Sequence, residues 1–158
     1  TPGMEHRVGG LEKWEETGHV SYDPENHQKM VELRQQKVDV IANDIPLAKA
    51  FGKGNGDLLV IGWGGTHGAL RSAVETAQAN GMSVSHLHLR HLNPLPRNLG
   101  EILVKFQKVM IAELNMGQLA AIIRSKFLVD AVSLNKVQGK PFTITEVFKK
   151  ITELVKGA

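Results

Sequence analysis

Four short, mostly apolar runs, separated by longer stretches with helical spacing, constrain the fold of this chain more than any other feature. They lie at residues 58–61, 84–89, 109–112 and 131–134. An apolar run of this kind is typical of a strand that is covered on both faces. Strands that alternate with helical segments of about 10–15 residues indicate parallel strands joined by crossover helices. We therefore expect residues 57–158 to form an α/β domain, a three-layer α/β/α arrangement with a mainly parallel sheet.

Local signals mark the ends of several expected helices. Helical patterns cover residues 66–80, 98–106 and 119–129, and a last helix follows residue 143. Gly81 predicts a left-handed end to the first of them. Asn98 and Glu101 can cap the short second one, and Thr143 with Glu146 predicts a capping box at the start of the last.

The amino-terminal third of the chain follows a different pattern. Residues 1–24 are polar and glycine-rich, so they bury too little apolar surface to fold alone, and we expect an extended arm. Asp23 and Pro24 predict a helix start, with the helix running to about residue 43. The glycine-rich segment 52–56 predicts a boundary. We expect an arm and linker helix over residues 1–56 and the α/β domain over residues 57–158.

Composition excludes several classes of function. The chain has no cysteine, which rules out a disulfide scaffold, a cysteine nucleophile, a thiolate zinc site and a cysteine-bound iron–sulfur cluster within it. The net charge is +3, but the basic residues are scattered, so we expect no nucleic-acid binding. No run approaches the roughly 20 apolar residues of a membrane span, and no export leader is seen. We expect a cytoplasmic protein that binds neither membrane nor nucleic acid.

The first candidate site is the glycine-rich turn after the first apolar run. Gly64, Gly65, Thr66 and His67 lie where a strand should turn into a helix, and free amides there can hold an anion. The turn does not match a dinucleotide fingerprint, because the sixth position from Gly62 is a histidine. A tight turn with no binding role explains the same residues.

A second candidate is a histidine-rich strand end. His86, His88 and His91 follow the order of a binuclear zinc hydrolase motif, and two of them share a strand face. Arg90 stands where that motif needs a carboxylate ligand, and a guanidinium would repel the metal. We favour the alternative explanation, partly buried imidazoles at a strand end that are hydrogen-bonded to the backbone or to a partner.

Two further segments are candidates for contact with a substrate or partner. His6 and Arg7 lie in the polar arm, where solvated surface is the alternative explanation. Asn135 and Lys136 follow the fourth apolar run, at the strand end where open α/β sheets place their binding crevices. A plain connecting loop is the alternative there. From residues alone, the chain carries no complete catalytic set.

Several segments together resemble the α-subunit of 2-oxoacid:ferredoxin oxidoreductases, the 2-oxoglutarate type in particular. The resemblance rests on HRVGGLE at 6–12, GHVSYDPENHQKM at 18–30, GWG at 62–64, HLR at 88–90, LNPLP at 92–96, ELNMGQL at 113–119 and VSLNKVQGKPF at 132–142. The chain departs from the family pattern at Gly9 and Gly10, usually threonine-glycine, at Lys13, usually histidine, and at Gly65, usually serine. Because of these departures, the family's contacts between the amino-terminal arm and the substrate are not carried over to this chain, whereas the resemblance to the family stands.

The resemblance implies a role in a larger enzyme. Such enzymes decarboxylate a 2-oxoacid on thiamine diphosphate and Mg²⁺, pass electrons through an iron–sulfur cluster to ferredoxin, and release the acyl group on coenzyme A. It also implies a domain of the transketolase C-terminal type, a β-subunit partner and an oligomeric enzyme. We expect this chain to be the C-terminal part of the α-subunit, to bind none of these cofactors itself, to contribute no catalytic residue and to be inactive alone. A non-catalytic interaction module stays open as an alternative.

Overall fold

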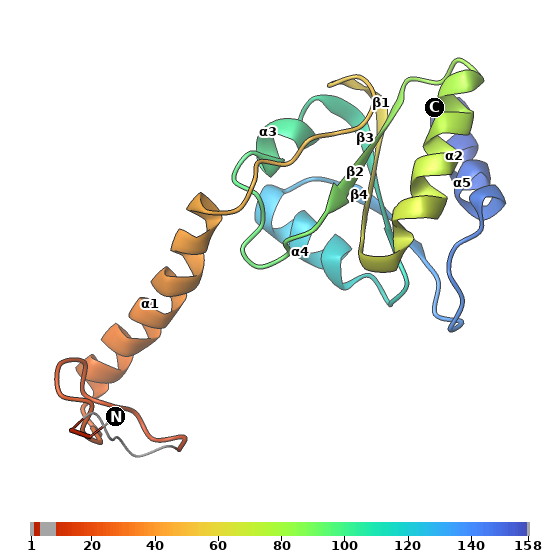
Figure 1. The fold of residues 1–158 in the computed structure, drawn as a ribbon. Helices are drawn as coiled ribbons and strands as arrows, with labels where there is room; N and C mark the ends of the chain where they lie inside the picture. Colours follow the sequence, from red (N-terminus) through yellow and green to blue (C-terminus); the bar gives the residue numbers. More distant parts are fainter. Residues whose placement is uncertain (1, 4–8, 158) are drawn as a thin grey trace. The chain divides into compact units, whose positions relative to one another are not determined.

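The computed structural model describes residues 2–3 and 9–157 (Figure 1). The chain divides into two compact units, Thr1–Asp44 and Ile45–Ala158. No helix among the described residues is both long enough and apolar enough to cross a membrane.

The first unit is a helix with its preceding arm folded against it. Helix α1 spans Pro24–Val40 and begins as predicted, because the Asp23 carboxylate accepts a hydrogen bond from the Asn26 amide at 2.7 Å. A short 3₁₀ turn, η1 (Ile41–Asn43), follows it. In the arm, Glu12 accepts two hydrogen bonds of 3.1 Å from Arg34, which hold the pKa of that carboxyl down to about 2. The described part of the arm is therefore fixed to its own helix.

The second unit contains one sheet of four parallel strands. They are β1 (Gly56–Trp63), β2 (Val84–Leu89), β3 (Phe106–Glu113) and β4 (Ala131–Asn135). Their order across the sheet is β2-β1-β3-β4, with every neighbouring pair parallel. All four apolar runs of the sequence thus form strands, and their register brings all four carboxyl ends to one edge.

Helices cover both faces of this sheet (Figure 1). They are α2 (His67–Ala79), α3 (Leu99–Leu103), α4 (Gln118–Phe127) and α5 (Ile144–Lys156), with the 3₁₀ turn η2 (Gly64–Thr66) preceding α2. Helices α2 and α5 pack side by side on one face, and α3 and α4 lie on the other. Alternate residues of β1 point to the two faces of the sheet. Leu58 and Val60 pack in the core with α2 and α5, whereas Leu59 and Ile61 pack in the core on the opposite face. The expected three-layer α/β/α class is confirmed.

Two more of the predicted helix ends are confirmed, and one prediction is wrong. Gly81 has φ +80°, and Thr143 and Glu146 form the complete capping box of α5. Asn98 does not cap α3. Its side chain instead accepts from the Ala48 N–H and donates to the Ala48 carbonyl, both at 2.9 Å, because a long-range backbone partner competes for the same amide.

Helix α4 ends in an unusual residue. Leu128 has φ +54° and is 90% exposed, although the left-handed region disfavours any side chain with a Cβ. Its amide still closes the helix by donating to the Arg124 carbonyl at 3.0 Å.

The division between the units falls at Asp44 and Ile45, whereas the sequence analysis expected a boundary at residue 56. The segment ahead of β1 belongs to the second unit because it bonds to it. Besides the Ala48 pair, Phe51 and His86 exchange backbone hydrogen bonds of 2.7 and 2.9 Å in an antiparallel bridge. This segment therefore lies against β2, which is an edge strand of the sheet.

Candidate functional site

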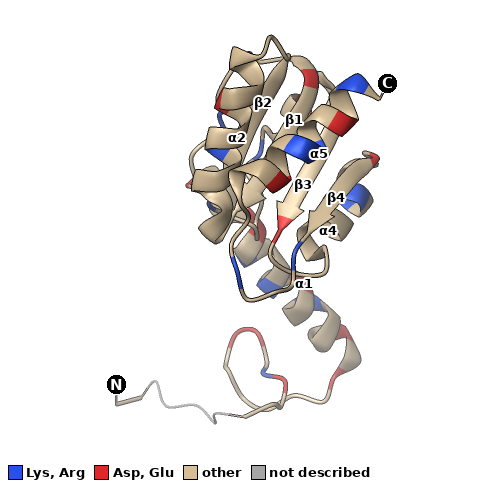
Figure 2. Ribbon diagram, turned by 90° about the vertical axis from the view of Figure 1, so that its right-hand side faces the viewer, with Lys and Arg blue, Asp and Glu red and all other residues tan. Residues whose placement is uncertain are grey.

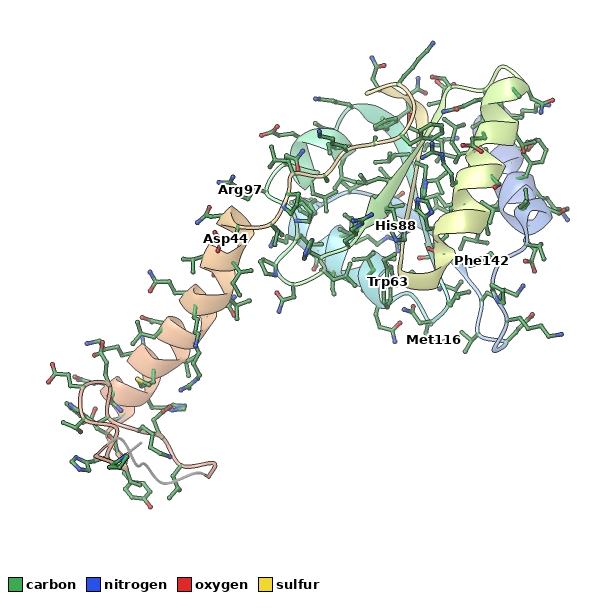
Figure 3. The ribbon with its side chains drawn as sticks, in the orientation of Figure 1. Asp44, Trp63, His88, Arg97, Met116 and Phe142 are labelled. Carbon is green, nitrogen blue, oxygen red and sulfur yellow. The ribbon has the colours of Figure 1, made fainter. Side chains whose placement is uncertain are left out.

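The carboxyl edge of the sheet gathers the loops that follow all four strands. From β1 the chain continues to β2 on one side, and from β3 to β4 on the other, so the strand order reverses between β1 and β3. Open α/β sheets bind ligands at such reversal points. Figure 3 shows Trp63, the last residue of β1, and Met116, in the loop after β3, at the same end of the sheet.

The glycine-rich turn leaves β1 on the side of α2. Gly64 adopts φ +57°, and the Thr66 hydroxyl donates to the Trp63 carbonyl at 2.9 Å, which closes the turn. Gly62 is required by close packing, because a Cβ there would lie 2.2 Å from Leu70 Cδ1. No side chain of a described residue caps α2, so the first amides of this helix have no side-chain acceptor there.

A buried carboxylate, which the sequence analysis missed, organises the same edge. Glu113 ends β3, at the red tip of that strand in Figure 2, and is 0% exposed. Its oxygens accept from the amides of Leu119 and Ala120, each at 2.9 Å, from Asn115 Nδ2 at 3.0 Å and from Trp63 Nε1 at 3.3 Å. One carboxylate therefore caps α4, where the helix dipole favours a negative charge, and ties that helix to the β1 turn.

Asn115 and Asn135 shape the loop between β3 and α4. Asn115 Oδ1 accepts from the Gly117 amide at 2.7 Å and from the Gln118 amide at 3.3 Å. Gly117 has φ +99°, and a Cβ there would lie 3.1 Å from Asn135 Nδ2. Asn135, a predicted contact residue, thus lies beside this loop.

Lys136 is bonded within the chain. Its ammonium donates to both oxygens of Glu146 at 2.8 Å and to the Pro141 carbonyl at 3.0 Å, and its side chain is 9% exposed. The lysine is the main cause that lowers the pKa of Glu146 to about 2, and hydrogen bonds from Thr143 add to it. Lys136 therefore fixes the loop between β4 and α5, and the neighbouring Lys140 is the exposed cation of that loop.

Two adjoining cavities of about 140 and 300 Å³ lie at this edge, and we call them together the carboxyl-edge crevice. Gly65 and Leu114 line both, Trp63 lines the smaller one, and Lys136 and Lys140 line the larger one. The structure thus brings the glycine-rich turn and the loop after Asn135 to one surface. Open helix amides and a lysine suit an anionic group or a partner surface, and they supply no nucleophile or general base.

The histidine cluster of the structure does not consist of the three residues predicted from the sequence. His67, at the start of α2, packs against His88 and His86, with ring centroids 4.9 and 5.5 Å away. Burial is the main cause that lowers the pKa of His86, to about 4, and of His88, and the neighbouring His67 adds to both. Burial leaves His86 Nε2 and His88 Nδ1 without a hydrogen-bond partner in the structure.

This arrangement does not support the zinc-hydrolase alternative. His91 lies in the loop after β2 rather than in the cluster with His86 and His88. Among the residues that the structure describes, no three histidine, aspartate or glutamate side chains are placed to hold a metal ion. Of the other predicted contact residues, His6 and Arg7 lie outside the described residues.

Comparison with known proteins identifies a family model and several relatives. The model described as pyruvate:ferredoxin oxidoreductase core domain II matches residues 56–147. The 2-oxoglutarate oxidoreductase subunit KorA of Mycobacterium tuberculosis is 46% identical over 99% of this chain, and the α-subunit of 2-oxoacid:ferredoxin oxidoreductase 1 of Aeropyrum pernix is 30% identical over 90% of it. The chain spans 24% of the length of each of these relatives.

Solved structures agree with the fold. A 2-oxoglutarate:ferredoxin oxidoreductase from Magnetococcus marinus, solved with 2-oxoglutarate, coenzyme A and succinyl-CoA bound, matches 98% of this chain and 27% of its own with a TM-score of 0.87 and 29% identity. A split-gene transketolase matches 68% of this chain and 41% of its own with a TM-score of 0.54 at 17% identity, which supports the expected transketolase-like architecture alone.

Proposed function

Because this chain belongs to the family of pyruvate:ferredoxin oxidoreductase core domain II, we propose that it is part of the α-subunit of a 2-oxoacid:ferredoxin oxidoreductase. The observation that carries the proposal is the 46% identity with the KorA subunit over 99% of the chain. We propose 2-oxoglutarate as the substrate. The whole enzyme would convert it with coenzyme A to succinyl-CoA and CO₂, and the two electrons released would reduce ferredoxin.

The residues of this chain do not fit the metal-dependent cofactors of that reaction. An iron–sulfur cluster of the ordinary type needs cysteine thiolates, and the chain has none. Thiamine diphosphate is held through Mg²⁺, which needs carboxylate and carbonyl oxygens, and the described residues contain no group of three or more histidine, aspartate or glutamate side chains placed to hold a metal ion. We propose that these cofactors are bound by other parts of the enzyme and that this chain supplies no catalytic residue.

The proposed role of the chain is to position and contact the rest of the enzyme. The carboxyl-edge crevice is the surface we assign to that role, because it lies at the reversal point of the sheet and presents exposed Leu114 beside open helix amides. Candidate partners are the β-subunit and ferredoxin, in an oligomeric assembly located in the cytoplasm.

One experiment tests the enzymatic part of the proposal. The complete α-subunit that contains this chain is co-expressed with the β-subunit and assayed for ferredoxin reduction with 2-oxoglutarate and coenzyme A. We expect turnover that requires both subunits and is greater with 2-oxoglutarate than with pyruvate, and none from the isolated chain. Turnover by the 158-residue chain alone would refute the proposal.

A second experiment tests the contact role. Leu114→Asp changes an exposed apolar side chain of the crevice, and Ile122→Asp makes the same change on α4, away from the crevice. We expect Leu114→Asp to weaken co-purification of the α- and β-subunits and Ile122→Asp to leave it intact. Equal behaviour of the two variants would count against the crevice as the contact surface.

A further inference from the structure

A further cavity at the carboxyl edge differs from the crevice in the charge of its lining residues. It has a volume of about 430 Å³ and lies between the extended segment 46–49, the end of β2 and the loop that reaches Pro96. We call it the Arg90 pocket. Ligand cavities of small molecules fall in the range of about 300–1,000 Å³, so the pocket has room for a small anion and part of an attached group.

The walls of the Arg90 pocket carry one sign of charge. Lys49, Arg90, His88 and His91 line it, and none of the described residues that line it is acidic. Arg90 acts electrostatically on His88, whose pKa it helps to lower after burial and His67. Lys49, Arg90 and His91 are exposed and form no ion pair with a described residue.

The pocket is held in shape by hydrogen bonds on one side and by a buried apolar side chain on the other. On one side, Ala48 is paired twice with the Asn98 side chain and Phe51 is bridged to His86. On the other side, Leu95 is only 6% exposed and anchors the loop that follows His91. A fixed concave wall with two cations, Lys49 and Arg90, that form no ion pair with a described residue differs from a scattering of mobile surface lysines, because binding does not have to order it first.

We propose that the Arg90 pocket binds a phosphate group, with the guanidinium of Arg90 as its principal donor, Lys49 as a supporting cation and His91 as a supporting hydrogen-bond donor. Arginine presents a planar set of donors that matches a phosphate, whereas lysine acts as a point charge. The half-buried His88, labelled in Figure 3, lies in the carboxyl half of β2. It lines the pocket together with Arg90. This site is separate from the carboxyl-edge crevice and does not depend on the proposed activity.

The test is a titration of the purified full chain with inorganic phosphate, followed by NMR and calorimetry. We expect saturable binding that weakens with added salt, with signal changes centred on residues 46–49 and 88–91. Arg90→Gln should weaken binding at least about tenfold, because a charge-assisted hydrogen bond is lost. Arg124→Gln removes an exposed arginine of α4 and is the matched control, expected to bind like the unchanged chain.

A replacement variant and a second ligand complete the test. If Arg90→Gln fails to fold, as judged by circular dichroism, Lys49→Gln in the exposed segment takes its place and should weaken binding in the same direction. Adenosine 3′,5′-bisphosphate distinguishes the sources of the phosphate: tighter, Arg90-dependent binding than inorganic phosphate indicates a nucleotide, and equal binding indicates the free ion. Absence of saturable phosphate binding, or equal weakening by Arg90→Gln and Arg124→Gln, would overturn the proposal.

Discussion

Glu113 has no exposure to solvent, and all four hydrogen bonds that the structure gives its oxygens come from N–H donors. Replacement by glutamine puts an NH₂ group where an acceptor is needed and removes the charge at the start of α4. We expect Glu113→Gln to lower the free energy of unfolding by about 2–4 kcal/mol, measured by urea denaturation.

The matched control for this variant is an exposed glutamate. Glu75 forms a surface ion pair with Arg71 at 2.7 Å on α2. Glu75→Gln should cost no more than about 0.5 kcal/mol, since exposed pairs contribute little. Similar losses for the two variants would show that Glu113 does not organise the edge of the sheet.

His86 makes the stability of the second unit depend on pH. Burial lowers its pKa from 6.5 to about 4 in the folded chain, with His67, His88 and Arg71 adding in the same direction. Between these two pH values the unfolded chain binds a proton that the folded chain does not, so stability falls as pH falls from 6.5 to 4. The expected loss from His86 is about 2–3 kcal/mol, measured by urea denaturation at pH 7 and pH 4.5.

Removing the imidazole should flatten this dependence. His86→Leu is the suitable change, because no described residue is hydrogen-bonded to His86 Nε2 and would be left unsatisfied there. His91→Gln, which removes an exposed imidazole outside the cluster, should retain the pH dependence of the unchanged chain. A His86→Leu chain with undiminished loss between pH 7 and pH 4.5 would contradict the assignment.

For single residues, the sequence predicted local roles better than contacts with distant partners. Gly81 and the Thr143–Glu146 pair act locally, so their roles followed from spacing alone. The role of Glu113 was missed, although a charged residue directly after an apolar run is a usable signal. Asn98 was assigned to the wrong partner, because its bonds to Ala48 join positions far apart in the chain.

Among the elements, the β1 turn offers a sharp test of close packing. A methyl group at Gly62 would meet Leu70 Cδ1 at 2.2 Å and Thr66 Oγ1 at 2.5 Å, and both side chains are buried. Gly62→Ala should therefore destabilise the chain by about 1–3 kcal/mol. Gly65→Ala has open space around its Cβ and should change the unfolding free energy little. Thermal unfolding of the pair measures the difference, and equal melting temperatures would contradict it.

The start of α5 tests the capping box. Thr143 Oγ1 accepts from the Glu146 amide at 3.2 Å, so Thr143→Ala should cost about 1 kcal/mol in urea denaturation. Thr145→Ala changes an exposed threonine two residues further along the chain, and it should lower the free energy of unfolding clearly less. A larger loss for Thr145→Ala than for Thr143→Ala would be inconsistent with the cap.

Element type was predictable because buried parallel strands have a strong signature. The four apolar runs became the four strands, and the helical spacings between them became α2, α3 and α4. The order β2-β1-β3-β4 could not be read from the sequence, because strand pairing depends on contacts between distant segments. For the same reason the addition of His67 to the histidine cluster came from the structure.

For the whole molecule, the two compact units and the family model give different starting points for the α/β domain. The second unit begins at Ile45, whereas the family model begins at residue 56. We propose Ile45 as the start of the independently stable domain. A chain of residues 45–158 should keep the unfolding free energy of the second unit.

A chain of residues 57–158 should be less stable by about 3–5 kcal/mol, because it loses the Ala48 and Phe51 bonds and the apolar cover that this segment gives the edge strand. Urea denaturation of both truncated chains measures the difference. Equal stability would favour the boundary at residue 56.

Leu128 has a practical consequence for work with the domain. A leucine held at φ +54° with 90% of its surface in solvent contributes little packing to its own helix end. Glycine adopts this backbone conformation without steric penalty. Leu128→Gly is therefore a natural first substitution for obtaining a more stable protein for crystallisation or ligand screening. A melting temperature raised by a few degrees, with no change in secondary structure, would show the gain.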